Sequence, residues 1–221
     1  SEGARTTPSI VAFTNDDEDY TNLKVTEINY NPVDSIIGKD TVDGKSFEFI
    51  ELKNTGKKPI NLTGLKISSS IEYEFKDNEL LSPKQFYVIA SKPKWFYERY
   101  GQVPTANFDK NFSNSGEKVN ISNARGNSII SFWYSDSEPW SPLADGKGYT
   151  LSSPIRYPTG SPNNFNYWIA SSVYNGSPFA DDPGIMDANR EVELGGNEIA
   201  IYPNPTQGKV FFKFDNNDSD V

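Results

Sequence analysis

The sequence predicts an all-β protein whose sheets pack face to face as a β-sandwich. Short segments with alternating apolar residues recur from Leu23 to about Ile169, and turn-forming residues separate them. Aromatic residues make up 14% of the 221 residues, and 15 Pro and 16 Gly are spread along the chain, as in proteins with many turns. Roughly seven or eight short strands separated in this way are typical of a sandwich.

The first two predicted strands are residues 23–30 and 47–54, with a polar stretch at 34–42 between them. The second strand has apolar residues on both of its faces, which predicts a central strand with Ile50 and Leu52 nearly fully buried. Alternation then continues through six further segments. These predicted strands are residues 60–68, 71–75, 86–91, 117–122, 128–134 and 148–153.

One segment, residues 93–100, has helical character. Pro93 suits the first helical position, and Gly101 suits the residue just after a helix end. Phe96 and Tyr100 are four residues apart and therefore share one face of a helix. The sequence thus predicts a single short helix that crosses one end of the sandwich.

A β-hairpin fragment is predicted near the C-terminus. Two alternating strands, at 199–201 and 210–214, flank the turn-forming residues 202–208. Two strands alone are marginally stable in water, so this hairpin either completes the preceding sheet or begins a further domain. Residues 180–197 lack periodicity and contain Pro and Gly, which predicts a linker and favours the second interpretation.

Composition and charge exclude several classes of function. The chain has no Cys and no His, which removes thiol nucleophiles, His-assisted serine chemistry and Cys or His zinc sites. The formal charge of −9 disfavours nucleic-acid binding, and no apolar run is long enough to span a membrane. Carboxylate chemistry remains: a glycosidase-like Asp/Glu pair or a calcium site.

Six acidic residues are candidates for such chemistry. Any two of Glu27, Glu48 and Glu51, which lie beside apolar strand residues, would form a catalytic pair or calcium ligands in the functional interpretation. In the structural interpretation, which we favour, they bind backbone groups or face solvent. The turn residues Asp145, Asp181 and Asp182 are calcium candidates, but the sequence favours turn formation for them.

Four tryptophans are candidates for stacking on a ligand. Trp133, Trp140 and Trp168 could form a sugar-binding platform, but we expect them to pack in the core and at its corners. Trp95 lies on the predicted helix and is the better candidate for an exposed ligand surface, although packing is favoured there as well. No catalytic, cofactor-binding or metal-binding residue is therefore assigned.

Six segments taken together resemble the lamin-tail domain in its bacterial form, over residues 23–179. The resemblance implies an immunoglobulin-like β-sandwich and an accessory module of extracellular bacterial proteins, often beside nucleases, proteases or other hydrolases. The segments occur in the family's order and spacing. They are residues 25–32, 47–68, 80–91, 111–134, 139–153 and 166–179.

The segment IYPNPTQGKVFFKF, residues 201–214, resembles the start of the C-terminal sorting domain of type IX secretion in Bacteroidetes. The resemblance implies export to the cell surface and contact with the secretion machinery. The expected organisation is a flexible lead-in at 1–22, the lamin-tail-like domain at 23–179, a linker at 180–197 and a truncated sorting domain at 198–221.

These observations together predict a non-catalytic extracellular module with a structural, adhesive or ligand-binding role at the bacterial cell surface. Its expected partner is a protein or a carbohydrate, not a nucleic acid, and the chain is expected to be a monomer without a transmembrane segment. The alternative is an accessory or targeting module of a secreted hydrolase with carboxylate-bound calcium. Two carboxylates converging in a concave, aromatic-lined pocket would favour an enzyme.

Overall fold

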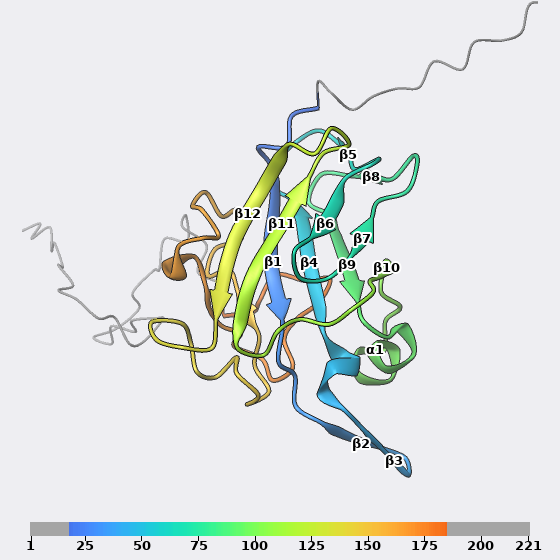
Figure 1. Ribbon diagram of the computed structural model, residues 1–221, viewed down its shortest axis with the longest axis vertical. Helices are drawn as coiled ribbons and strands as arrows, with labels where there is room; N and C mark the ends of the chain where they lie inside the picture. Colours follow the sequence, from blue (N-terminus) through green and yellow to red (C-terminus); the bar gives the residue numbers. More distant parts are fainter. Residues whose placement is uncertain (1–17, 185–221) are drawn as a thin grey trace, which may run out of the picture.

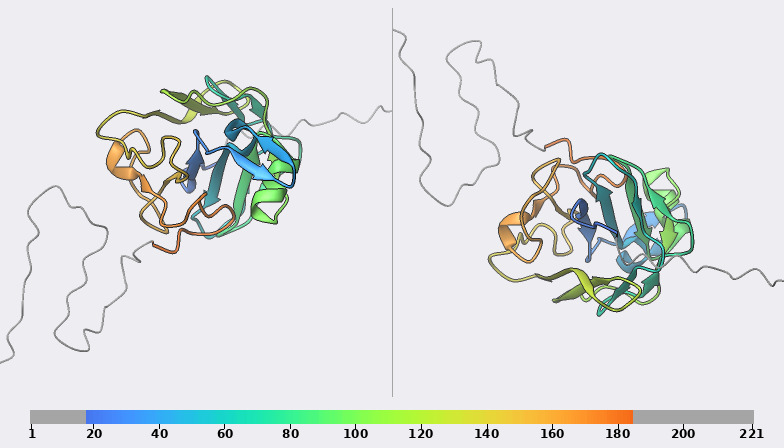
Figure 2. Two further views of the ribbon diagram at one scale, coloured as in Figure 1. Left: turned by 90° about the horizontal axis from the view of Figure 1, so that it is seen from below. Right: turned by 90° about the horizontal axis from the view of Figure 1, so that it is seen from above.

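Residues 18–184 are described by the computed structural model and form a β-sandwich of a six-stranded and a four-stranded sheet (Figure 1). Viewed along the strands, the two sheets form separate layers (Figure 2). The first sheet has the order β10 (Ala106–Asn107), β9 (Phe86–Ala90), β4 (Phe49–Asn54), β1 (Leu23–Asn29), β13 (Leu151–Ser152) and β14 (Ile169–Ala170). The second has the order β12 (Ser128–Ser135), β11 (Gly116–Ser122), β6 (Lys66–Ser68) and β7 (Tyr73–Glu74). The all-β sandwich prediction is confirmed.

The main core lies between the two sheets. Ile50 and Leu52 of β4 are both 0% exposed and pack in this core, as the sequence predicts for a central strand. The four-stranded sheet contributes Val119, Ile121 and Phe132 to the same cluster. Alternation along β4 turns its other residues, among them Phe49 and Glu51, toward the outer face of the six-stranded sheet.

The predicted helix is confirmed as α1 (Pro93–Tyr100), and it packs against this outer face, where Phe96 meets residues of β4 and β9. Pro93 occupies the start of the helix, and Gly101 ends it in the left-handed region with φ of 67° while its N–H bonds the Tyr97 carbonyl. Phe96 is fully buried and meets Phe49 edge to face, with 5.8 Å between the ring centroids. This contact anchors α1 on the sheet.

The rest of the outer face is crossed by residues 171–184, which we call the strap. Phe179 of the strap packs edge to face on Phe96, with 6.3 Å between ring centroids. Residues 180–184, assigned to the linker from composition, also contact the sandwich: Asp181 pairs with the buried Lys53 of β4, and Asp182 is 3% exposed. The remaining linker residues and the predicted hairpin at 198–221 lie outside the described residues.

Several elements differ from the sequence prediction. The polar stretch at 34–42 forms a hairpin of β2 (Ser35–Ile37) and β3 (Asp40–Val42). The strands predicted at 71–75 and 148–153 shorten to two residues each, and next to β7 Glu72 adds only an isolated bridge, to Asp109. The strand predicted at 60–68 is divided into β5 (Ile60–Asn61) and β6, and the elements that the sequence did not predict are β8 (Leu80–Leu81), β10, β14 and the 3-10 turns η1 (Gly44–Phe47) and η2 (Phe165–Tyr167).

Replacement of Leu52 by Ala tests the central position of β4. Because Leu52 is 0% exposed, Leu52→Ala should lower the free energy of unfolding by ~2–5 kcal/mol through lost burial and a cavity. Urea unfolding followed by tryptophan fluorescence measures this. The matched control is Leu80→Ala in β8, where the side chain is 61% exposed and the change should be within ~0.5 kcal/mol. Equal losses in the two variants would contradict the assignment.

Candidate functional site

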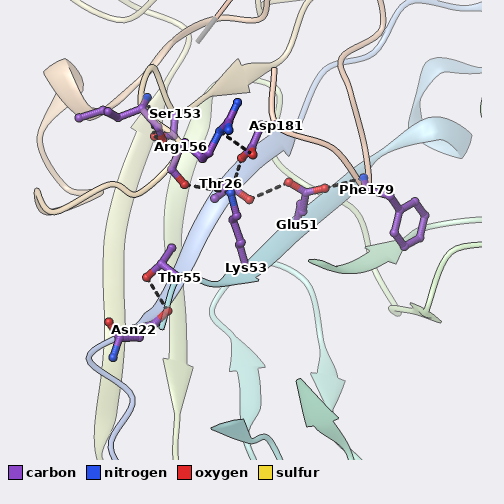
Figure 3. A network of polar contacts seen from close by, with 10 residues as sticks. Asn22, Thr26, Glu51, Lys53, Thr55, Ser153, Arg156, Phe179 and Asp181 are labelled. Atoms are coloured by element: carbon purple, nitrogen blue, oxygen red, sulfur yellow. Dashed lines mark hydrogen bonds and ion pairs between the residues drawn. The ribbon is translucent and has the colours of Figure 1, made fainter. Parts of the chain in front are cut away.

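Two of the candidate carboxyls, Glu27 in β1 and Glu51 in β4, lie directly across from each other in neighbouring strands. Both are about 1% exposed. Glu27 accepts hydrogen bonds from the Thr150 hydroxyl and from the Ser177 backbone N–H, at 3.1 Å for the latter. Glu51 accepts from the backbone N–H of Phe179 at 2.7 Å (Figure 3). The two carboxyls therefore hold the strap on the sheet.

This burial changes the protonation of both groups. Removal from water raises the pKa of Glu27 to about 8, and the hydrogen bonds from Thr150 and Ser177 offset part of that rise. Burial also raises the pKa of Glu51 well above its usual range, and repulsion from Glu27 adds to the effect. Such shifts occur at catalytic acids, so the space around the pair decides what it can do.

That space is too small for a substrate. The cavity beside Glu27 and Glu51 has a volume of about 10 Å³, whereas one water molecule needs roughly 10–15 Å³. It is closed by Ala180, Asp181 and Asp182 of the strap. The pair consequently has no concave, aromatic-lined pocket of the kind that a glycosidase requires, and its described contacts are structural.

The third candidate carboxyl, Glu48, lies apart from this pair and is 0% exposed. It accepts hydrogen bonds from the Phe112 backbone N–H at 3.0 Å and from the Asn111 side-chain amide at 2.9 Å. Burial raises the pKa of Glu48 to about 7. Each of the three glutamates thus accepts a hydrogen bond from a backbone N–H, in agreement with the structural interpretation.

The three candidate aspartates also have structural partners. Asp181 forms ion pairs with Lys53 and with the Arg156 Nε, the latter at 3.2 Å (Figure 3). Asp182 accepts from the Ser172 backbone N–H at 2.7 Å, and Asp145 accepts from the Asn31 side-chain amide at 2.7 Å. Between residues 18 and 184, no group of three or more acidic residues is arranged to hold a metal ion.

Among residues 18–184, no two tryptophan rings contact each other, and Trp168 instead contacts Phe132 and Tyr167. Trp168 is buried and Trp140 packs against the core, as the sequence predicts. Trp133 contradicts the packing prediction, since it is 58% exposed. The reason is its place on β12: alternation turns Phe132 and Tyr134 into the core and Trp133 outward. Trp95 is half-buried beneath Lys94, whose ammonium lies 4.1 Å from the ring centroid.

A cleft of about 500 Å³ opens between the start of β1 and the edge strand β12, and we call it the edge cleft. Three segments line it, 20–25, 129–131 and 160–162, together with Tyr167. Its volume falls in the range of small-molecule sites, roughly 300–1,000 Å³. The sequence did not predict this site, because it depends on how far β13 extends along β1.

The geometry of β1 creates the edge cleft. On one side β1 pairs with β4 along its length, but on the other side β13 reaches only Glu27 and Ile28. Toward the start of β1, the buried Tyr167 donates a hydrogen bond of 2.8 Å to the Val25 carbonyl. Among the described residues, Lys24 is the one charged residue in the lining, and none of their carboxylates lines the cleft. Burial lowers the pKa of Lys24.

The two facing sheets, the short helix and the open side define an immunoglobulin-like β-sandwich module. A family model for the lamin tail domain matches residues 17–136, more than half of the chain. The chain belongs to the lamin tail domain family. No curated protein matches the chain. The matched region ends after β12, so β13, β14 and the strap lie beyond it.

The comparisons leave the C-terminal residues 198–221 unmatched, and the resemblance to a sorting domain stays a prediction. Within residues 18–184, the helices are too short and too polar to cross a membrane.

The buried carboxyls predict that acidity stabilises the fold. A carboxyl whose pKa is higher in the folded chain binds protons that the unfolded chain has already released, so stability decreases as pH rises. The free energy of unfolding should therefore fall from about pH 5 to about pH 8. Glu27→Gln should flatten this fall, whereas Glu98→Gln on the exposed side of α1 should not. Thermal melts across the range measure it, and an unchanged slope in Glu27→Gln would contradict the prediction.

The Lys53–Asp181 pair predicts an asymmetric response to substitution. The side chain of Lys53 is 2% exposed, so Asp181→Ala leaves a buried ammonium with only the Arg156 carbonyl as acceptor. This should cost about 1–3 kcal/mol of unfolding free energy. The double variant Lys53→Met/Asp181→Ala should recover most of the loss, because it removes the buried ammonium, while Arg156, which also loses its ion pair with Asp181, is 43% exposed. Urea unfolding at pH 7 compares them, and equal stability of the single and double variants would refute this role.

Proposed function

We propose that this chain is a non-catalytic, ligand-binding immunoglobulin-like module of a protein exported to the bacterial cell surface. The observation that carries the proposal is the edge cleft, a concave site of about 500 Å³ on rigid sandwich elements. The strap closes over the buried pair Glu27 and Glu51, leaving no room there for a substrate. Binding rather than turnover is the function that this geometry supports.

Three further features support the proposal. Membership of the lamin tail domain family is consistent with a non-catalytic module. The resemblance of residues 201–214 to a type IX sorting domain supports export, with the secretion machinery as a second partner. The net charge of −9 disfavours a nucleic acid as the ligand and favours a protein or a carbohydrate. No observation on the described residues favours the alternative of a calcium-dependent hydrolase accessory.

Gly160→Trp is a suitable variant for blocking the edge cleft. A Cβ at Gly160 would lie 3.6 Å from the Tyr167 ring, an ordinary contact, so the backbone accepts a side chain there. Binding of the full chain to peptide and glycan arrays should fall at least tenfold in this variant. Glu98→Trp, which adds the same ring on the exposed side of α1, is the matched control and should bind as the unmodified chain does.

Export is tested separately on cells of the source bacterium. Antibodies against the sandwich should label intact cells as strongly as permeabilised cells. Labelling that requires permeabilisation would refute the surface location, and array binding unaffected by Gly160→Trp would refute the cleft as the ligand site.

A further inference from the structure

β12 presents an open backbone edge to the edge cleft. It pairs with β11 on one side, and no strand of residues 18–184 pairs with it on the other. The Trp133 N–H points away from β11, since it donates to the Asn163 side-chain oxygen at 2.9 Å. Backbone direction repeats every two residues in a strand, so the N–H and C=O of Ser131 point the same way. Among the described residues, neither group of Ser131 has a partner on that side.

This edge is unusual within the sandwich. The other edge strands, β7, β10 and β14, are two residues long, whereas β12 has eight residues. None of those eight residues is charged, and none is Pro or Gly. Natural sheets usually protect such edges with charge, Pro or shortness, because an open edge is a template for another strand. The Ser131 end of β12 lacks all three protections.

The walls of the edge cleft favour a narrow occupant over a second sheet. Residues 160–162, Ser131 and the start of β1 all line this cleft of about 500 Å³. We expect a single extended chain to enter this volume, whereas the flat edge of a second copy of the sandwich would have to pass the 160–162 loop. The Asn163 amide, which already accepts from Trp133, shows that a peptide-like carbonyl is accepted beside this edge.

Charge specifies the occupant further. Lys24 is the single charged residue in the lining, and it has no ion-pair partner among residues 18–184. A cation without a nearby carboxylate is notable in a chain of net charge −9. An acidic group on the ligand supplies the missing partner.

We infer that the edge cleft binds an extended peptide segment of a partner protein, which adds to β12 as a further strand and carries an acidic side chain for Lys24. The inference rests on the proposed function and names its ligand class. The peptide backbone exchanges hydrogen bonds with the N–H and C=O of Ser131. Alternate apolar side chains of the peptide face Leu23, Val25 and Tyr167, which gives the sequence preference that strand addition commonly shows.

Selection from a phage library of random twelve-residue peptides against the full chain tests the inference. The expected result is enrichment of sequences that alternate apolar residues and contain Asp or Glu. On addition of a selected synthetic peptide, hydrogen exchange of the Ser131 amide should slow at least tenfold. No enrichment, enrichment without alternation, or unchanged exchange at Ser131 would overturn the inference.

Two variants separate backbone pairing from mere occupancy of the cleft. Ser131→Pro removes the outward N–H without breaking a bond to β11, and Pro is tolerated on edge strands. It should weaken the selected peptide at least tenfold, while Ser131→Ala, which keeps the N–H, should not. Lys24→Glu should weaken acidic peptides more than neutral ones. Hydrogen exchange on the unmodified chain gives an independent readout if Ser131→Pro fails to fold.

The outcomes distinguish this inference from the proposed function. Binding lost in Gly160→Trp but retained in Ser131→Pro would leave a cleft-binding module and refute strand addition. Selected peptides that match residues 199–214 would assign the edge to this chain's own C-terminal segment. Sedimentation showing a dimer that Ser131→Pro disrupts would assign it to a second copy. Either of the last two results would overturn the partner peptide.

Discussion

Helix α1 and the strap cover the outer face of the six-stranded sheet, and hydrogen bonds to two buried carboxyls hold the strap there. The remaining structure depends on these hydrogen bonds. Glu27 and Glu51, on adjacent central strands, accept the backbone N–H groups of Ser177 and Phe179. Burying a carboxyl costs free energy unless it is hydrogen-bonded or protonated. The strap supplies the hydrogen-bond donors, and the raised pKa values of both carboxyls favour their protonated forms. Once the strap is held, Phe179 packs against Phe96 of the helix, and the closed outer face has no room for a ligand beside the two carboxyls.

The two faces of the central strand β4 are stabilised by different interactions. Its inner face is an ordinary apolar core, in which Leu52 is stabilised by burial. Its outer face carries the ionisable Glu51 and Lys53, and each is matched by a partner from the strap. The outer face therefore specifies which segment covers it, because an apolar segment without amide donors or a carboxylate would leave buried charges unpaired.

Much of the fold was predictable because it depends on local patterns. Alternation revealed the long strands, and Pro93 and Gly101 marked the helix ends. The two-residue strands were not predictable, since their pairing depends on neighbours distant in sequence. Trp133 was assigned to the core because an alternating strand does not reveal which of its faces is inward when both carry aromatic residues. The edge cleft escaped prediction for a related reason: it arises where β13 stops along β1, and no residue in β1 signals that end.

The strap also determines the order in which the molecule can be completed during synthesis. Glu27 and Ser177 are separated by 150 residues, so the Glu27 carboxyl emerges from the ribosome long before its backbone donor. Until residue 184 has been added, a nascent chain can form both sheets around Leu52 but cannot cover the central carboxyls. Contacts of such long sequence separation form slowly because a large loop must close first. In a chain that folds as it is synthesised, the docking of the strap therefore has to follow the pairing of β1 with β4.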